Sequence, residues 1–145
     1  MGQPIFEYNE TTATATCFLE FEGQVFVGTA QAHPEDMDMA TKLVGQDIAY
    51  RRAMIKYLCF VRDWQIKPEL KALKQLYYTM AHSTHFNEKS YENKMLQRQL
   101  RQLESDLTTV KEEIANERQE LKTLINEKDN FYKQIRIIRQ KAKNN

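Results

Sequence analysis

Hydrophobic residues near the start of the chain form two short runs that have the composition of β-strands. Residues 17–21 and 24–27 are rich in aromatic and β-branched side chains, and Glu22-Gly23 separates them. Two such runs joined by a short turn containing glycine are typical of a β-hairpin. We therefore predict a hairpin over residues 14–32, to which residues 5–8 can add a short third strand.

The period then becomes helical. Between residues 45 and 64, apolar side chains recur at steps of three, four or seven, which favours an amphipathic helix. Pro68 suits the first turn of another helix, because proline lacks the amide hydrogen that this position does not need. Residues 81–87 are polar and contain two histidines, so we expect a loop there, and Ser90 is a plausible N-cap of the helix that follows.

The last third of the chain carries a heptad repeat. Apolar residues alternate at steps of four and three from residue 96 to residue 138, and Glu117 and Lys128 interrupt them. This spacing predicts the seam of a coiled coil, in a rod of roughly 65 Å at 1.5 Å per residue. Folding back on the helix at Pro68 covers only part of the seam, so we expect self-association, with at least two copies. The predicted seam residues are Leu96, Leu100, Leu103, Leu107, Val110, Ile114, Leu121, Leu124, Phe131, Ile135 and Ile138.

Glycine and proline divide the sequence in the same way. All four glycines and all three prolines lie within the first 68 residues, so nothing after them obliges the backbone to turn. We predict an α+β protein with a small antiparallel sheet and helices in a head, residues 1–87. A long coiled-coil oligomerisation helix with a basic C-terminal end follows, residues 88–145.

Composition and charge narrow the possible functions. The chain is 41% hydrophobic and 28% charged, with a net charge of +1, so no overall charge draws it to nucleic acid or to a membrane. The charge is uneven, since Asp129 is the last acidic residue. The sequence contains no apolar run long enough for a membrane span and no pattern of a signal peptide. We expect Cys17 and Cys59 to be buried free thiols, with a disulfide as the alternative. These features predict a cytoplasmic protein.

Motifs for catalysis are missing from the sequence. We find no nucleophile elbow, phosphate-binding glycine loop or metalloprotease pattern, so we expect no enzyme and no cofactor. Two sets of residues could hold a cation: His82 and His85 with a cysteine, and the acidic residues Glu35, Asp36 and Asp38. Polar surface explains the first set better, and helix capping explains the second better, because neither has the ligand spacing of a metal site.

Aromatic and basic residues are mixed in residues 77–101. Aromatic rings stack on bases and guanidinium groups grip phosphates, so such a mixture suits a nucleotide-like ligand. The alternative is that the rings belong to a core and the charges to a solvated helix face. Arg51 and Arg52 can likewise either cap a ligand pocket or pair with nearby acidic residues. The mixture consists of Tyr77, Tyr78, Phe86, Tyr91, Lys89, Asn93, Lys94, Arg98 and Arg101.

Three segments resemble a family of small phage proteins. They are residues 28–36 (GTAQAHPED), 45–53 (GQDIAYRRA) and 86–98, which begins FNEKSYEN. On these segments the chain resembles the first Thoeris anti-defence family, the phage "sponge" proteins. The resemblance implies an antiparallel sheet with long helices and an oligomer in the host cytoplasm. It also implies sequestration, without turnover, of a cyclic ADP-ribose isomer or cyclic oligonucleotide made by bacterial immune enzymes.

The resemblance further implies a pocket between protomers that uses an aromatic residue, an asparagine and arginines. It assigns base and ribose contacts to Phe86 and Asn93, and phosphate contacts to Arg98 and Arg101. Arg136 and Arg139, also three residues apart, are rivals for the phosphate. The full expected set of ligand-binding residues is Phe86, Asn93, Arg98, Arg101, Tyr91 and Arg52.

Three classes of function follow, in decreasing order of preference. A ligand-sequestering sponge needs the aromatic and basic residues to converge. A structural coiled-coil adaptor binds no ligand. A nucleic-acid-binding accessory protein, the least favoured, would use the basic residues from Lys133 to Lys143 and would lose affinity steeply with salt.

Overall fold

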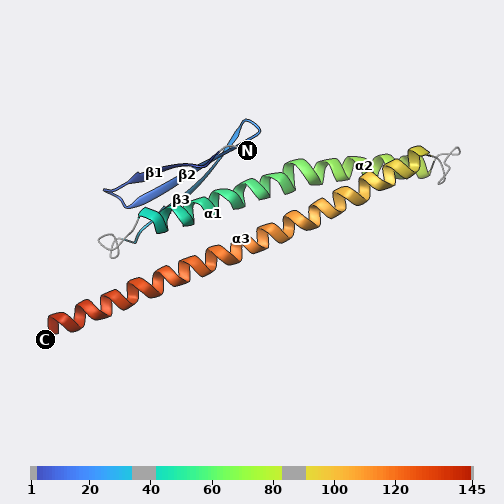
Figure 1. Ribbon diagram of the computed structural model, residues 1–145. Helices are drawn as coiled ribbons and strands as arrows, with labels where there is room; N and C mark the ends of the chain where they lie inside the picture. Colours follow the sequence, from blue (N-terminus) through green and yellow to red (C-terminus); the bar gives the residue numbers. More distant parts are fainter. Residues whose placement is uncertain (1–2, 34–41, 83–90, 145) are drawn as a thin grey trace. The chain divides into compact units, whose positions relative to one another are not determined.

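The computed structural model describes residues 3–33, 42–82 and 91–144 (Figure 1). An antiparallel sheet is followed by helices, the last of them 54 residues long, so the predicted α+β class is confirmed. The elements, in order, are β1 (Ile5–Asn9), β2 (Thr14–Phe21), β3 (Gln24–Gln31), α1 (Lys42–Phe60), the π-helix η2 (Val61–Ile66), α2 (Lys67–Ala81) and α3 (Tyr91–Asn144).

Contacts group the chain into two compact units. One consists of Met1–Tyr57 with Ala115–Asn145, and the other is Leu58–Ile114. The first holds the sheet, most of α1 and the second part of α3. The second holds η2, α2 and the first part of α3. The predicted division into a head and a coiled-coil helix at residue 88 stays a prediction.

The three strands form a meander in the order β1-β2-β3. Glu22 and Gly23, between β2 and β3, have φ values of 51° and 80°. Both lie in the left-handed region, as the type I′ turn of a tight hairpin requires. The predicted hairpin and the predicted third strand are therefore both confirmed.

One face of the sheet packs against α1. Alternate residues of β2 point to this face, namely Ala15, Cys17 and Leu19, and each is at most 2% exposed. Their neighbours on α1 are mostly alanines, so helix and sheet approach closely. At Gly28 of β3, an added Cβ would overlap the backbone of Ala49 and Ala53. The buried cluster comprises Ala15, Cys17, Leu19, Ala30, Ile48, Ala49 and Ala53.

Two basic side chains of α1 protect the free edge of β3. Arg52 Nη1 donates a hydrogen bond to the carbonyl oxygen of Thr29 at 2.7 Å, and Lys56 Nζ donates to that of Val27, also at 2.7 Å. The two carbonyls are two residues apart, so they leave the strand on the same side. An unpaired strand edge invites pairing with another chain, and these cations occupy its acceptors.

A π-helix turn connects α1 to α2. The backbone amide of Lys67 donates to the carbonyl of Arg62, five residues earlier. Pro68 explains this turn, because its ring would clash with the carbonyl of residue 64 in a regular α-helix and it has no amide hydrogen to donate. The prediction that Pro68 lies in the first turn of a helix is confirmed, but no loop precedes it.

In the second unit, α3 runs antiparallel to α2. Gln97 Nε2 donates to the Tyr77 hydroxyl at 3.2 Å, and Lys74 Nζ lies 3.7 Å from Glu104 Oε1. The order of these pairs is reversed between the helices, as antiparallel packing requires. Leu96, at the start of this stretch of α3, is only 6% exposed.

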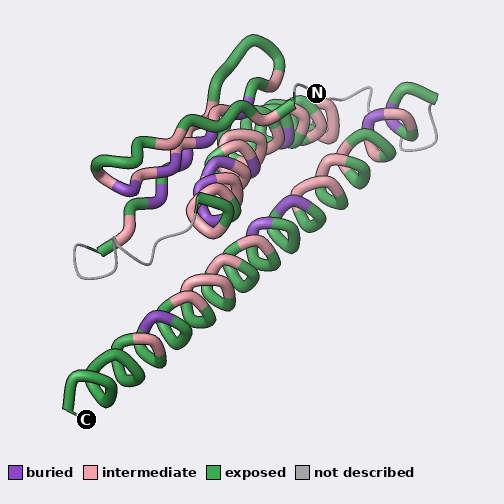
Figure 2. The backbone as a smooth tube through the Cα atoms, turned by 60° about the vertical axis from the view of Figure 1, so that its left-hand side comes forward, coloured by how far each residue is buried: buried purple, intermediate pink, exposed green. Residues whose placement is uncertain are grey.

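Much of the seam of α3 is covered within one chain. In the second unit Val110 and Ile114 are 5% and 2% exposed, and in the first unit Leu121 and Leu124 pack against the sheet–α1 core. Figure 2 shows this as a stripe of buried and half-buried residues along α3. The helix at Pro68, α2, lies along the part of the seam in the second unit, and the sheet–α1 core covers a further part in the first unit. Self-association itself stays a prediction.

Candidate functional site

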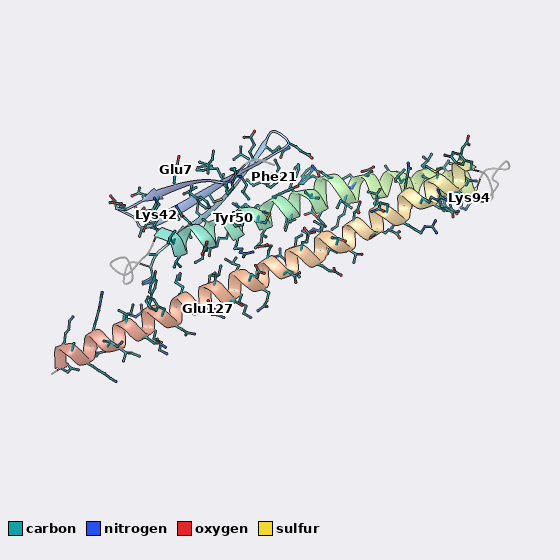
Figure 3. The ribbon with its side chains drawn as sticks, viewed as in Figure 1. Glu7, Phe21, Lys42, Tyr50, Lys94 and Glu127 are labelled. Carbon is teal, nitrogen blue, oxygen red and sulfur yellow. The ribbon has the colours of Figure 1, made fainter. Side chains whose placement is uncertain are left out.

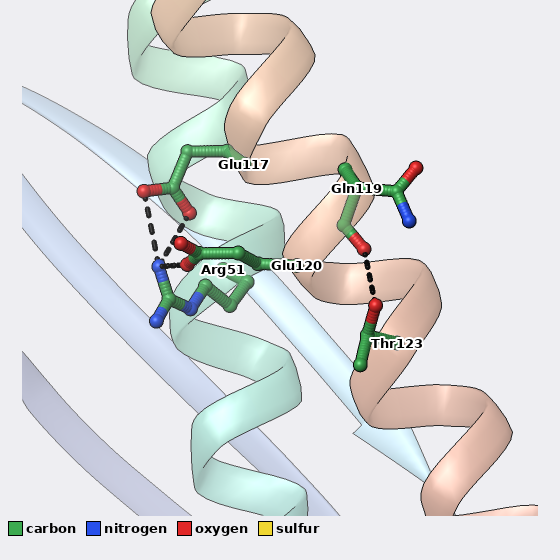
Figure 4. Close-up of polar contacts among 5 residues, drawn as sticks. All are labelled: Arg51, Glu117, Gln119, Glu120 and Thr123. Atoms are coloured by element: carbon green, nitrogen blue, oxygen red, sulfur yellow. Dashed lines mark hydrogen bonds and ion pairs between the residues drawn. The ribbon is translucent and has the colours of Figure 1, made fainter.

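An ion cluster joins α1 to α3 in the first unit (Figure 4). Arg51 Nη1 lies 3.1 and 2.9 Å from the two carboxylate oxygens of Glu117 and also pairs with Glu120. The hydrogen bond to Glu117 is the main cause that raises the pKa of Arg51 above its ordinary value. Glu117 interrupts the predicted apolar seam because it faces this guanidinium.

A cavity of about 520 Å³ lies beside this cluster. Tyr50, labelled in Figure 3, contributes from α1. Thr123 on α3 donates its hydroxyl hydrogen to the carbonyl of Gln119 at 3.1 Å. Because acidic groups here outnumber the single guanidinium, the cavity is unsuited to an anionic ligand. Its lining residues are Asp47, Tyr50, Arg51, Gln119, Glu120, Thr123 and Leu124.

A larger groove, which we call the α2 groove, has a volume of about 750 Å³. Lys67, Lys71, Lys74 and Tyr78 follow one another at steps of four, three and four, so they lie on one face of the helix. Leu70, which is 6% exposed, contributes an apolar surface. The groove is lined by Lys67, Leu70, Lys71, Lys74, Gln75, Tyr78 and Thr79, all from α2.

The lysines of the α2 groove are available to bind an anionic ligand, because their existing ion pairs are weak. Lys67 lies 3.4 Å from Asp63 and Lys74 lies 3.7 Å from Glu104, and both lysine side chains are at least half exposed. Exposed pairs of this kind are worth only about 0–1 kcal/mol, so a ligand anion can replace them at little cost. Lys71 forms no ion pair with any residue in the described part of the chain.

Aromatic surface adjoins these lysines. Tyr78 is 65% exposed, and its ring centroid lies 4.1 Å from that of His82. His82 Nδ1 lies 2.8 Å from the Tyr78 carbonyl oxygen, which fixes the imidazole near the tyrosine ring. An exposed ring beside ammonium groups can stack on a flat ligand while the lysines contact its negative charge.

The residues expected to bind ligand do not form one pocket in the described chain. Asn93 is 3% exposed, whereas Tyr91 is 75% exposed and Arg98 and Arg101 are exposed on the same helix. Arg52 belongs to the first unit and bonds the edge of β3. Phe86 lies outside the described residues. Their role in binding stays a prediction.

The possible cation sites receive no support from the part of the chain described. His85 and the acidic residues Glu35, Asp36 and Asp38 lie outside it, as does Ser90. The described residues contain no group of three or more histidine, cysteine or acidic side chains that could hold a metal ion. No helix among them is long and apolar enough to cross a membrane.

Both cysteines are free thiols, as expected. Cys17 is buried in the sheet–α1 core, and burial raises the pKa of its thiol. Cys59 is only half-buried, so the prediction that both are buried is wrong for this residue. Cys59 follows the packed part of α1, where the helix no longer lies in the core.

Sequence reasoning missed the two features that stand out in the structure. The step of four, three and four from Lys67 to Tyr78 is visible in the sequence, but the predicted mixture of aromatic and basic residues begins only at Tyr77. The Arg51–Glu117 pair spans 66 residues, and no local pattern indicates which distant side chain a seam-breaking Glu117 would meet.

Comparison of the chain with protein families, with curated proteins and with solved structures found no match.

Proposed function

We propose that this protein binds a nucleotide with negatively charged phosphates in the α2 groove and holds it without chemical turnover. The observation that carries the proposal is the set of three lysines and one exposed tyrosine on a single helix face beside a volume of about 750 Å³. The groove is open on the side away from α2, so a ligand would lie along this helix face and not inside an enclosed pocket.

The chemistry of the lining suits the two parts of a nucleotide. Lysine ammonium groups are compact cations on flexible stems, so Lys67, Lys71 and Lys74 can follow phosphates without a fixed geometry. The ring of Tyr78 offers a face for a base, and stacking of this kind is worth about 1–3 kcal/mol per base. Leu70 adds apolar contact.

Among the described residues, the side chains that line the groove are lysine, leucine, glutamine, tyrosine and threonine, which supply positive charge, hydrogen bonds and apolar contact for binding. The proposal therefore has the protein remove a nucleotide from solution, as a sponge for a cyclic nucleotide signal would, in an oligomer of at least two copies.

Native mass spectrometry tests this proposal. The protein is purified and mixed with cyclic ADP-ribose isomers and, separately, with cyclic dinucleotides. We expect adducts at a fixed stoichiometry with one of these classes, and recovery of ligand of unchanged mass after denaturation. Lys71→Glu and Tyr78→Ala should each weaken binding at least tenfold.

Lys122→Glu is the matched control, because Lys122 is an exposed lysine on α3 in the other unit. It changes the net charge as much as Lys71→Glu does, so it should leave the affinity unchanged. Altered ligand mass would show an enzyme instead of a sponge. Absence of any adduct would leave a structural adaptor as the better function.

A further inference from the structure

The charge of the chain is strongly polarised along α3. Five of the 21 basic residues follow Asp129, which is the last of the 20 acidic residues. The last 16 residues therefore carry a side-chain charge of +5, and the 129 before them carry −4. A basic segment on a chain that is otherwise acidic indicates a polyanionic partner for that segment alone. The five basic residues are Lys133, Arg136, Arg139, Lys141 and Lys143.

One face of α3 changes character after Tyr132. Up to that residue it packs against the head: Ile125 lies against the core and Tyr132 is 3% exposed. The same face then continues at steps of four, three and four through Arg136, Arg139 and Lys143, which are all exposed. From residue 133 to residue 144 only Ile135 is partly covered. Exposed basic side chains thus predominate in this segment of α3.

We propose that residues 133–144 of α3 bind double-stranded DNA through its phosphate backbone. At 1.5 Å per residue this helix is about 18 Å long, and the major groove of B-DNA, roughly 12 Å wide, admits an α-helix. Arg136, Arg139 and Lys143 supply contacts along one edge of the helix. Exposed amides at Gln134 and Gln140 can hydrogen-bond to phosphates or base edges.

The composition of the segment favours duplex DNA over other polyanions. A helix that lies on a membrane needs a broad apolar face along its length, but the large apolar side chains of this segment are confined to Ile135, Ile137 and Ile138, and only Ala142 is apolar after them. Single strands are held by stacking on aromatic rings, and none follows Tyr132. The deep, narrow major groove of RNA duplexes excludes side chains. The proposal is independent of the α2 groove.

Fluorescence anisotropy with a labelled 20-base-pair duplex of mixed sequence tests the proposal, at several salt concentrations between 50 and 200 mM. Three to four phosphate contacts give a slope of log affinity against log salt of about −3 to −4, which is a loss of roughly 100-fold over this range. The variant Arg136→Gln/Arg139→Gln/Lys143→Gln should bind at least tenfold more weakly at 50 mM salt. Its slope should be shallower by about three.

Two controls separate position from total charge. Lys94→Gln/Lys111→Gln/Lys122→Gln removes the same charge from exposed sites elsewhere on α3, and Lys67→Gln/Lys71→Gln/Lys74→Gln removes it from the α2 groove. Both should bind duplex as the wild type does, with circular dichroism confirming that every variant remains folded. The proposal fails if the wild type does not bind at 50 mM salt or if either control loses as much affinity. It also fails if phosphatidylglycerol vesicles bind the chain and the duplex does not.

Discussion

At the scale of single residues, two positions determine how closely and how specifically the elements meet. Gly28 lets the backbone of β3 approach α1, where a side chain would overlap Ala49 and Ala53. Arg51 then connects α1 to α3 through Glu117 and Glu120. Position 28 therefore requires a residue without a side chain, and position 51 requires a positive charge.

Gly28→Ala should lower the free energy of unfolding by about 3 kcal/mol or more, because the backbone atoms of Ala49 and Ala53 leave no room for a methyl group. Urea denaturation followed by circular dichroism measures this change. Gly23→Asn is the control, since Gly23 has open space around it and asparagine tolerates a positive φ. A Gly28→Ala variant as stable as the wild type would show that β3 and α1 do not pack this closely.

Removal of the Arg51–Glu117 pair should cost about 1 kcal/mol of coupling energy. The pair is roughly one-quarter exposed, so water screens part of the attraction, and Glu120 keeps a partner for Arg51 when Glu117 is replaced. A double-mutant cycle with Arg51→Gln and Glu117→Gln measures the coupling by denaturation. A coupling near zero would mean that Glu117 interrupts the seam for another reason.

At the scale of elements, the sequence predicted well wherever a local period decides the outcome. The type I′ turn at Gly23 and the alternation along β2 needed no distant information. The helix start at Pro68 was predicted, but the π-helix before it was not. A π-helix forms there because the helix runs on from α1 to α2 without a break and must avoid the clash of the Pro68 ring with the carbonyl of residue 64. The cover that α1 gives to part of the α3 seam was not predicted, because a heptad seam has the same pattern whether its partner is another chain or an earlier helix of its own chain.

A covered and an exposed position of the α3 seam should respond differently when the side chain is shortened to alanine. Ile114→Ala should lower the free energy of unfolding by about 2–4 kcal/mol, since this side chain is 2% exposed within one chain. Ile138→Ala should cost less than about 0.5 kcal/mol, because its side chain is 66% exposed. Denaturation at a single low protein concentration compares them. Equal losses would show that Ile138 is buried in solution, most simply by a second copy.

At the scale of the whole molecule, burial of most of the seam limits where self-association can occur. Phe131 and Ile138, near the C-terminal end of the seam, are 55% and 66% exposed. Any dimer built on the seam must therefore use this end of α3. The same end carries the charge of +5, so two copies repel each other there while DNA would be attracted.

These opposite charge effects make salt the deciding variable. We expect light scattering to give at least twice the 17.2 kDa mass of one chain at 500 mM salt and less at 50 mM, because added ions screen the repulsion between copies. Phe131→Asp/Ile138→Asp should remain a monomer at both concentrations with unchanged helix content, since both positions are exposed. A dimer of that variant would place the interface elsewhere. Because DNA affinity should fall over the range in which self-association rises, the two activities of this helix end can be measured separately in one titration.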